Sequence, residues 1–164
     1  MKVTMTIGEA VSLRAALEPL LGVKNSKVGF ATIRNQNYLN TQLKEFDELR
    51  NGRGPLAPDG MEAFQAARET LVKHHASKTP NGKPVIKNGQ YDIADPEAFA
   101  KGFDDLRAEH REAIDACDNA VKELGESEQE FDLHWYEESW FPEDTPGVVL
   151  QSVLVLLRPE APDA

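Results

Sequence analysis

The stretch PVIKNGQYDIADPEAF, residues 84–99, predicts a β-hairpin that leads directly into a helix. Asn88-Gly89 lies between two short runs of strand-forming residues, and this dipeptide favours a type I′ turn because both residues accept positive φ. Asp95-Pro96 then predicts a helix start, since the aspartate can cap the helix and the proline stands where no N–H is needed. Helical patterns flank the stretch on both sides, so we expect a hairpin at about residues 83–94 that turns the chain at the tip of a helical arm.

The segment after the hairpin, residues 96–124, has the strongest helical periodicity of the chain. Its stripe residues recur at alternating spacings of four and three, which is typical of a coiled coil. A single helix of this length would extend about 43 Å and would need a packing partner all along it, within the chain or in a second copy. The stripe consists of Phe99, Phe103, Leu106, His110, Ala113, Cys117, Ala120 and Leu124.

Three further helices are predicted before the hairpin. Thr6 and Glu9 form a capping box at the start of a short N-terminal helix. Ser26 is a plausible cap for a second helix that ends at about Arg50, where Asn-Gly supplies a stop. The loop GRGPLAPDG breaks the chain, and helical spacing returns at about residues 60–76.

The first half of the second predicted helix is rich in amides. Asn35, Gln36, Asn37 and Asn40 surround Tyr38. Side chains of this kind are most often exposed or hydrogen-bonded locally, although a buried amide can fix the register between elements. We interpret these four as exposed or locally satisfied.

The C-terminal part is patterned differently. Residues 131–136 alternate apolar and polar side chains, which predicts a half-buried strand. The run VVLQSVLVLL, residues 148–157, follows a sequence that resembles a helix start, which favours a helix. Its β-branched residues leave open a strand paired with residues 130–136. The tail from residue 158 is expected to be loose.

Together these patterns predict a mainly α fold with a minor β component. We expect a long antiparallel helical hairpin, or coiled-coil arm, with the β-hairpin at its tip and a small helical base. A length of 164 residues suits one domain. Its parts would be an N-terminal docking segment (residues 1–25), the helical arm (26–125) and an acidic C-terminal segment (126–164).

The charge distribution bears on partners. The formal net charge is −10, which opposes direct binding to nucleic acid, and no basic patch offsets it. The span from Glu123 to Leu157 contains neither lysine nor arginine. This acidic span is either a solvated face or a docking surface for a basic protein partner. Its aromatic cluster, Trp135, Tyr136, Trp140 and Phe141, is either core or an exposed anchor.

The hairpin tip is likewise either a sturdy connector or a contact point. The candidate interaction residues of both regions are Glu126, Glu128, Glu130, Asp132, Trp135, Tyr136, Glu137, Glu138, Trp140, Glu143, Asp144, Lys83, Lys87 and Tyr91.

Motifs for catalysis, metal binding or nucleotide binding are missing from the sequence. It has no HExxH, CxxC, GxSxG or glycine-rich phosphate loop. Cys117 is the only cysteine and lies on the apolar stripe, where a thiol behaves as a small inert hydrophobe. No signal peptide and no membrane-spanning run are visible. We therefore expect no enzyme, no cofactor, no catalytic or metal site and no membrane partner.

The layout of these segments resembles a family of small bacteriophage proteins of unknown function, the DUF1617-like group. The resembling residues are MKVTMTIGEAVSLRAAL, MEAFQAARETLVKHH with NGKPVIKNGQYDIADPEAF, EQEFDLHWY and FPEDTPGVVLQSVL. The resemblance implies a phage origin and a helix in the last segment; it implies no catalytic residues. GRGPLAPDG departs from the continuous helical region of that pattern.

Two functional hypotheses follow. In the first, a phage-encoded protein in the host cytoplasm blocks a host enzyme or defence complex through its acidic surface. In the second, a virion structural or assembly component self-associates through its helical arm.

Overall fold

The computed structural model describes residues 2–151 and 153–158. The chain is mainly helical with two small antiparallel strand pairs, so the predicted fold class is confirmed at this level. Its contacts define two compact units. Unit 1 comprises the described residues of Met1–Phe46 and Glu123–Ala164, and unit 2 comprises Asp47–Lys122. In the described residues, no helix combines the length and apolar character needed to cross a membrane.

Unit 1 consists of helices, 3-10 turns and one strand pair. Two helices, α3 (Lys44–Arg50) and α6 (Arg111–Glu126), run through the boundaries of the units. The elements that lie wholly in unit 1 are β1 (Lys2–Thr6), α1 (Ile7–Ala16), η1 (Glu18–Gly22), α2 (Ser26–Gln42), β4 (Glu128–Asp132), η2 (Glu138–Trp140), α7 (Gly147–Gln151) and η3 (Leu154–Leu156).

The antiparallel pair β1–β4 joins the N-terminal strand to a strand far away in the sequence. Its register runs from Lys2 opposite Asp132 to Thr6 opposite Glu128. Strand β1 was not predicted, because its five residues directly precede a strong helix cap and its partner lies far away in the sequence. The strand predicted at residues 131–136 begins earlier, at Glu128, and ends at Asp132.

The N-terminal helix confirms its capping box. The amide of Glu9 donates to Thr6 Oγ1 at 3.1 Å, and the amide of Thr6 donates to Glu9 Oε2 at 2.7 Å. Helix α1 packs on α2, and the core of unit 1 forms between these helices, the strand pair and the C-terminal turns. Fully buried there are Leu17, Leu20, Val28, Leu39, Phe131, Leu133, Tyr136, Val153 and Leu156.

The second predicted helix is divided in two. Asn25, rather than Ser26, is the cap of α2, and its Oδ1 accepts from the amide of Lys27 at 2.9 Å. The helix ends at Gln42; the next residue, Leu43, leaves the helical region with φ −93° and ψ 2°, and α3 follows. The predicted stop after Arg50 is confirmed, with Gly52 at φ +63°.

The C-terminal run 148–157 is helical in short pieces, α7 and η3, so the helix prediction is confirmed in part. A strand does not form in its described residues, where Leu157 makes one isolated parallel bridge with Tyr136. The amide of Tyr136 donates to the Leu156 carbonyl at 2.8 Å. Position 152 and the tail expected to be loose, residues 159–164, lie outside the described residues.

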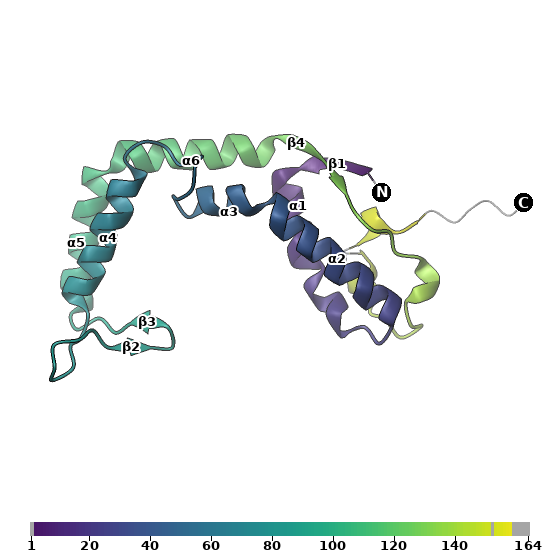
Figure 1. Ribbon diagram of the computed structural model, residues 1–164, viewed down its shortest axis with the longest axis horizontal. Coiled ribbons are helices and arrows are strands. Elements are labelled where there is room, and N and C mark those ends of the chain that lie inside the picture. Colours follow the sequence, from purple (N-terminus) through teal and green to yellow (C-terminus); the bar gives the residue numbers. More distant parts are fainter. Residues whose placement is uncertain (1, 152, 159–164) are drawn as a thin grey trace, which may run out of the picture. The chain divides into compact units, whose positions relative to one another are not determined.

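Unit 2 contains a helical hairpin with a β-hairpin at one end. Helices α4 (Met61–His75) and α5 (Pro96–Glu109) lie side by side, and β2 (Ile86–Lys87) pairs with β3 (Gln90–Tyr91) in the connection between them (Figure 1). Ring contacts at the two ends, Phe64 with His110 and His75 with Phe99, show that the helices run antiparallel.

The local predictions for the connection are confirmed. Asn88 and Gly89 adopt φ of 51° and 77°, the positive values of a type I′ turn. Asp95 Oδ1 accepts from the amide of Ala98 at 3.0 Å, with Pro96 at the first helical position.

The prediction of one continuous helix over residues 96–124 is wrong. The chain leaves helical geometry at His110, with φ −103° and ψ 20°, and α6 begins at Arg111. The break lets the His110 ring pack at 5.7 Å from Phe64 on α4. It also divides the stripe, because α5 packs on α4 whereas Cys117 of α6 packs near Leu49 of α3. Of the predicted arm, residues 26–46 pack in unit 1.

Candidate functional site

Strand β4 carries three of the predicted acidic residues on one face. Alternate residues of a strand point to the same side, so Glu128, Glu130 and Asp132 share a face of the β1–β4 pair. All three are exposed. Their carboxylates follow one another at about 7 Å along the strand, since each residue advances about 3.4 Å. We call this row of three carboxylates the acidic face.

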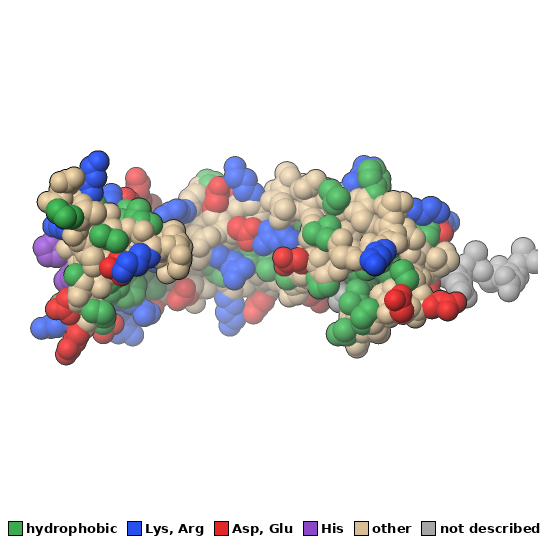
Figure 2. Space-filling view, turned by 90° about the horizontal axis from the view of Figure 1, so that it is seen from below, with side chains coloured by type: hydrophobic (Ala, Val, Ile, Leu, Met, Phe, Trp, Pro, Cys, Tyr) green, Lys and Arg blue, Asp and Glu red, His purple; other side chains and the backbone are tan. Residues whose placement is uncertain are grey.

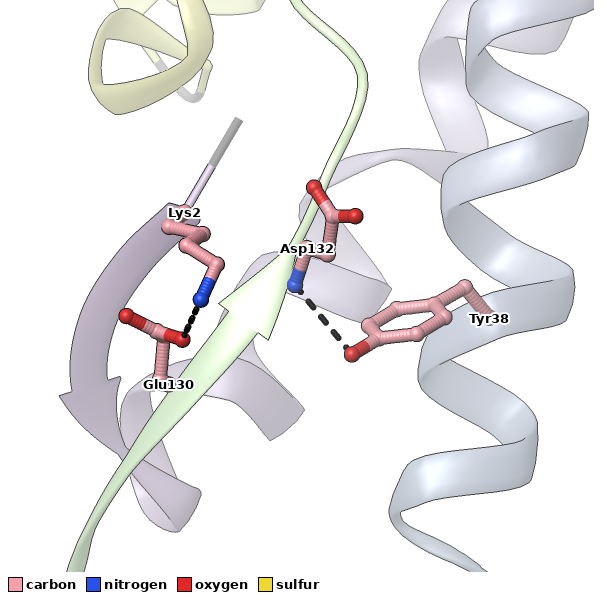
Figure 3. Close-up of polar contacts among 4 residues, drawn as sticks. All are labelled: Lys2, Tyr38, Glu130 and Asp132. Atoms are coloured by element: carbon pink, nitrogen blue, oxygen red, sulfur yellow. Dashed lines mark hydrogen bonds and ion pairs between the residues drawn. The ribbon is translucent and has the colours of Figure 1, made fainter.

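One lysine partly neutralises the acidic face. Lys2 Nζ lies 2.7 Å from Glu130 Oε1 across the strand pair (Figure 3). The hydrogen bond and the charge of Glu130 raise the pKa of this fully exposed lysine. Because both side chains are exposed, the pair adds little to stability.

The outer edge of β4 is held by helix α2. The amide of Asp132 donates to the Tyr38 hydroxyl oxygen at 3.1 Å, which occupies a strand amide that β1 does not pair. The carboxylate of Asp132 points away from the Tyr38 ring (Figure 3). The strand is therefore fixed from both sides while Glu128 and Glu130 stay exposed.

A buried amide fixes the chain directly after β4. Asn35 is fully buried; its Nδ2 donates to the His134 carbonyl at 3.0 Å and its Oδ1 accepts from the His134 amide at 2.7 Å. The interpretation of Asn35 as exposed or locally satisfied is therefore wrong. Asn35 therefore supplies both hydrogen-bond partners of the His134 backbone, which lies beyond the end of β4. In the sequence, no feature distinguished Asn35 from the other amide residues of its cluster.

The aromatic cluster of the acidic segment divides between core and surface. Trp135 is 39% exposed, whereas Tyr136 is fully buried, so Tyr136 is not a surface contact residue. Its hydroxyl lies 3.0 Å from Thr32 Oγ1. Because the single hydroxyl hydrogen of Thr32 goes to the Val28 carbonyl, Tyr136 is the donor of this bond. Burial raises the pKa of Tyr136, which keeps that hydrogen in place.

Trp140 and Phe141 pack inward to different extents. Phe141 is buried against the Tyr136 ring at 5.8 Å between centroids. Trp140 is partly buried beneath Lys27, whose Nζ lies 5.4 Å from the ring centroid. Trp140 is therefore covered by a side chain of this protein on one face, and Trp135 is the more accessible aromatic side chain.

The other acidic candidates belong to unit 1 outside strand β4. Glu137 is half-buried and lies 3.9 Å from Arg158. The exposed members of this group are Glu126, Glu138, Glu143 and Asp144. Figure 2 shows Lys and Arg side chains spread over the face in view with Asp and Glu side chains between them.

The three candidates of the hairpin lie in unit 2. Lys83 and Lys87 are exposed, and Lys87 Nζ lies 3.0 Å from Asp92 Oδ1. Tyr91 is half-buried opposite Ile86. The hairpin residues and the acidic residues thus belong to different compact units.

A group of side chains able to hold a metal ion is not assembled in the described part of the chain. Within residues 2–151 and 153–158, no cluster of three His, Cys, Asp or Glu side chains could hold a metal ion. The Cys117 thiol is buried and donates to the Leu49 carbonyl at 3.4 Å, and burial raises its pKa. A thiol in this state is a poor nucleophile.

His134 predicts a pH dependence of stability. Burial and the positive charge of Arg34 lower its pKa below the usual 6.5, so the folded protein favours the neutral imidazole. Below about pH 6.5 the unfolded chain binds the proton more readily, so stability is fully present above that pH and is lost as the pH falls towards the lowered pKa. Urea unfolding at pH 7 and pH 5.5 should show a larger loss for the wild type than for His134→Asn. Equal losses would contradict this assignment.

Comparison with protein-family models, with curated proteins and with solved structures finds no match to this chain.

Proposed function

We propose that the protein is a non-enzymatic protein-binding protein that docks a basic partner on the acidic face of β4. The observation that carries this proposal is the row of Glu128, Glu130 and Asp132, exposed on one side of a strand that is fixed by β1 and α2. The backbone of a rigid element loses little conformational freedom on binding, which favours affinity. The regular spacing suits a groove lined by lysine and arginine.

The surroundings of the acidic face support the same function. Trp135 follows the strand closely and is 39% exposed, and an accessible tryptophan beside a charged rim is the usual composition of a binding hot spot. The net charge of −10 would accelerate encounter with a basic partner. A partner that normally holds nucleic acid in a basic groove fits this chemistry. In a phage, such a protein would block a host enzyme or defence complex.

The experiment is affinity capture from host cells with matched charge variants. Glu128→Gln/Glu130→Gln removes two charges from the acidic face. Glu18→Gln/Glu45→Gln removes two exposed charges elsewhere on unit 1 and serves as the control. We expect the wild type and the control to capture one stoichiometric basic protein, with at least a tenfold lower yield for the acidic-face variant. Added salt should weaken the capture.

The second candidate function, a self-associating virion component, gives a different result. Capture of capsid or tail proteins, or only of the chain itself, with equal yields from both variants would refute docking on the acidic face. The half-exposed apolar residues Phe99, Phe103 and Leu106 of α5 favour this alternative. Sedimentation of the purified protein would then show an assembly that grows with concentration.

A further inference from the structure

Helix α5 is amphipathic and yet incompletely covered. It contains no buried residue, and its apolar side chains Phe99, Phe103 and Leu106 are each half-exposed. Within unit 2, α5 packs along α4. A helix that packs on one neighbour buries one side of its apolar stripe and leaves the other side exposed. An amphipathic helix in this condition has apolar surface left for a further element.

A groove lies between the two helices, and of the three apolar side chains of α5 named above Leu106 lines it, whereas Phe99 and Phe103 lie outside its lining. The groove has a volume of about 440 Å³ and is lined by Ala67 and Leu71 on α4 and by Gly102 and Leu106 on α5. Gly102 lets the helices approach closely, because a Cβ there would lie 3.0 Å from Leu71 Cδ1. On α4 the lining extends from Ala67 to His74, which is two helical turns or about 10 Å. A groove of this length accommodates two turns of a third helix.

The negative charge at the edge of the groove favours a basic occupant. Asp105 and Glu109, four residues apart on α5 and both exposed, form one edge of the groove, whose lining contains neither lysine nor arginine. A second copy of this chain would bring another pair of the same carboxylates and a further net charge of −10 to the interface. An occupant with cations along one flank would instead pair with this edge.

We propose that the groove between α4 and α5 docks a basic amphipathic helix of another protein. Apolar residues of that helix at spacings of three and four fill the space above Leu71 and Leu106, and its lysines or arginines meet Asp105 and Glu109. This surface belongs to unit 2 and is independent of the acidic face in unit 1.

The test uses a designed probe and two adjacent charge reversals. The probe is a fluorescein-labelled helical peptide of about 16 residues, or roughly 24 Å, with leucines on one face and lysines on one flank. Asp105→Lys alters the groove, whereas Asp104→Lys makes the same charge change on the same helix outside the lining. We expect Asp105→Lys to weaken binding about tenfold and Asp104→Lys less than threefold, measured by fluorescence anisotropy.

Further measurements separate the remaining outcomes. Ala67→Trp fills the groove and should abolish binding while circular dichroism confirms that the helices persist. Glu128→Gln/Glu130→Gln should leave binding unchanged, which excludes the acidic face as the peptide site. Equal binding of a peptide with glutamates in place of lysines, or equal effects of the two aspartate reversals, would overturn the proposal. So would a dimer in sedimentation that Ala67→Trp dissociates, because it would assign the groove to a second copy.

Discussion

Replacement of Phe131 by alanine is expected to lower the free energy of unfolding by about 3–5 kcal/mol, the range found when a buried aromatic side chain is truncated. Phe131 is fully buried in β4 and stands opposite Val3 of β1. The strand pair is short, so the aromatic side chain supplies much of the apolar contact that holds β4 on unit 1. Losing it leaves a cavity as well as the lost transfer energy.

Urea denaturation of unit 1, followed by the fluorescence of Trp135 and Trp140, measures this effect. Gln129→Ala is the control on the same strand, since Gln129 is half-buried and its truncation should cost less than about 1 kcal/mol. A loss below about 1.5 kcal/mol for Phe131→Ala would show that β4 is held mainly by its backbone and polar contacts. The Phe131 variant should also weaken partner capture at temperatures where unit 1 unfolds, whereas Glu128→Gln/Glu130→Gln should weaken it without lowering stability.

The features that the sequence predicted correctly depend on neighbouring residues. The capping box of Thr6 and Glu9, the type I′ turn at Asn88-Gly89 and the Asp95 cap each involve groups within a few positions of one another. Local hydrogen bonds and φ preferences decide such features whatever surrounds them. These features located the starts of α1 and α5 and the hairpin.

The features that it missed depend on contacts between distant residues. The pairing of Lys2 with Asp132 joins positions far apart in the sequence, and five residues that end at a helix cap have too weak a pattern to predict a strand. The break at His110 has a similar cause. Spacings of three and four continue through it, and the break coincides with the packing of the His110 ring on Phe64 of another helix. Periodicity cannot report that contact.

The candidate site shows the same division. Composition identified the acidic span, but the predicted strand began at residue 131, so the shared face of Glu128, Glu130 and Asp132 emerged only with the structure. Buried and exposed side chains alternate as far as Leu133. The alternation then stops, because β4 ends at Asp132 and the following residues no longer have strand geometry. Tyr136 then turns into the core while Trp135 faces outward. Which aromatic side chain remains accessible therefore follows from where the strand ends, which depends on the length of β1.

The hydrogen bonds between Asn35 and the His134 backbone predict a second large effect on stability. Asn35→Leu is expected to lower the free energy of unfolding by about 2–4 kcal/mol, although leucine has a similar size and higher hydrophobicity. The amide and carbonyl of His134 both bond Asn35, and leucine would leave both backbone groups without these partners in a partly buried place. The neighbouring Asn37 is exposed, and Asn37→Leu should change stability by less than about 0.5 kcal/mol.

Hydrogen exchange distinguishes a local loss of the Asn35–His134 hydrogen bonds from a general loss of stability. In Asn35→Leu the amide of His134 should exchange faster than the amides of α2, because its acceptor is gone while the helix remains. The Tyr136 hydroxyl still donates to Thr32, so the segment should stay docked at that point and loosen between Asp132 and Tyr136. The acidic face would then lie beside a mobile Trp135, and partner affinity should fall even at temperatures where the variant is folded. Uniform acceleration of exchange in α2 and at His134 would instead mean that Asn35 acts through the stability of unit 1 as a whole.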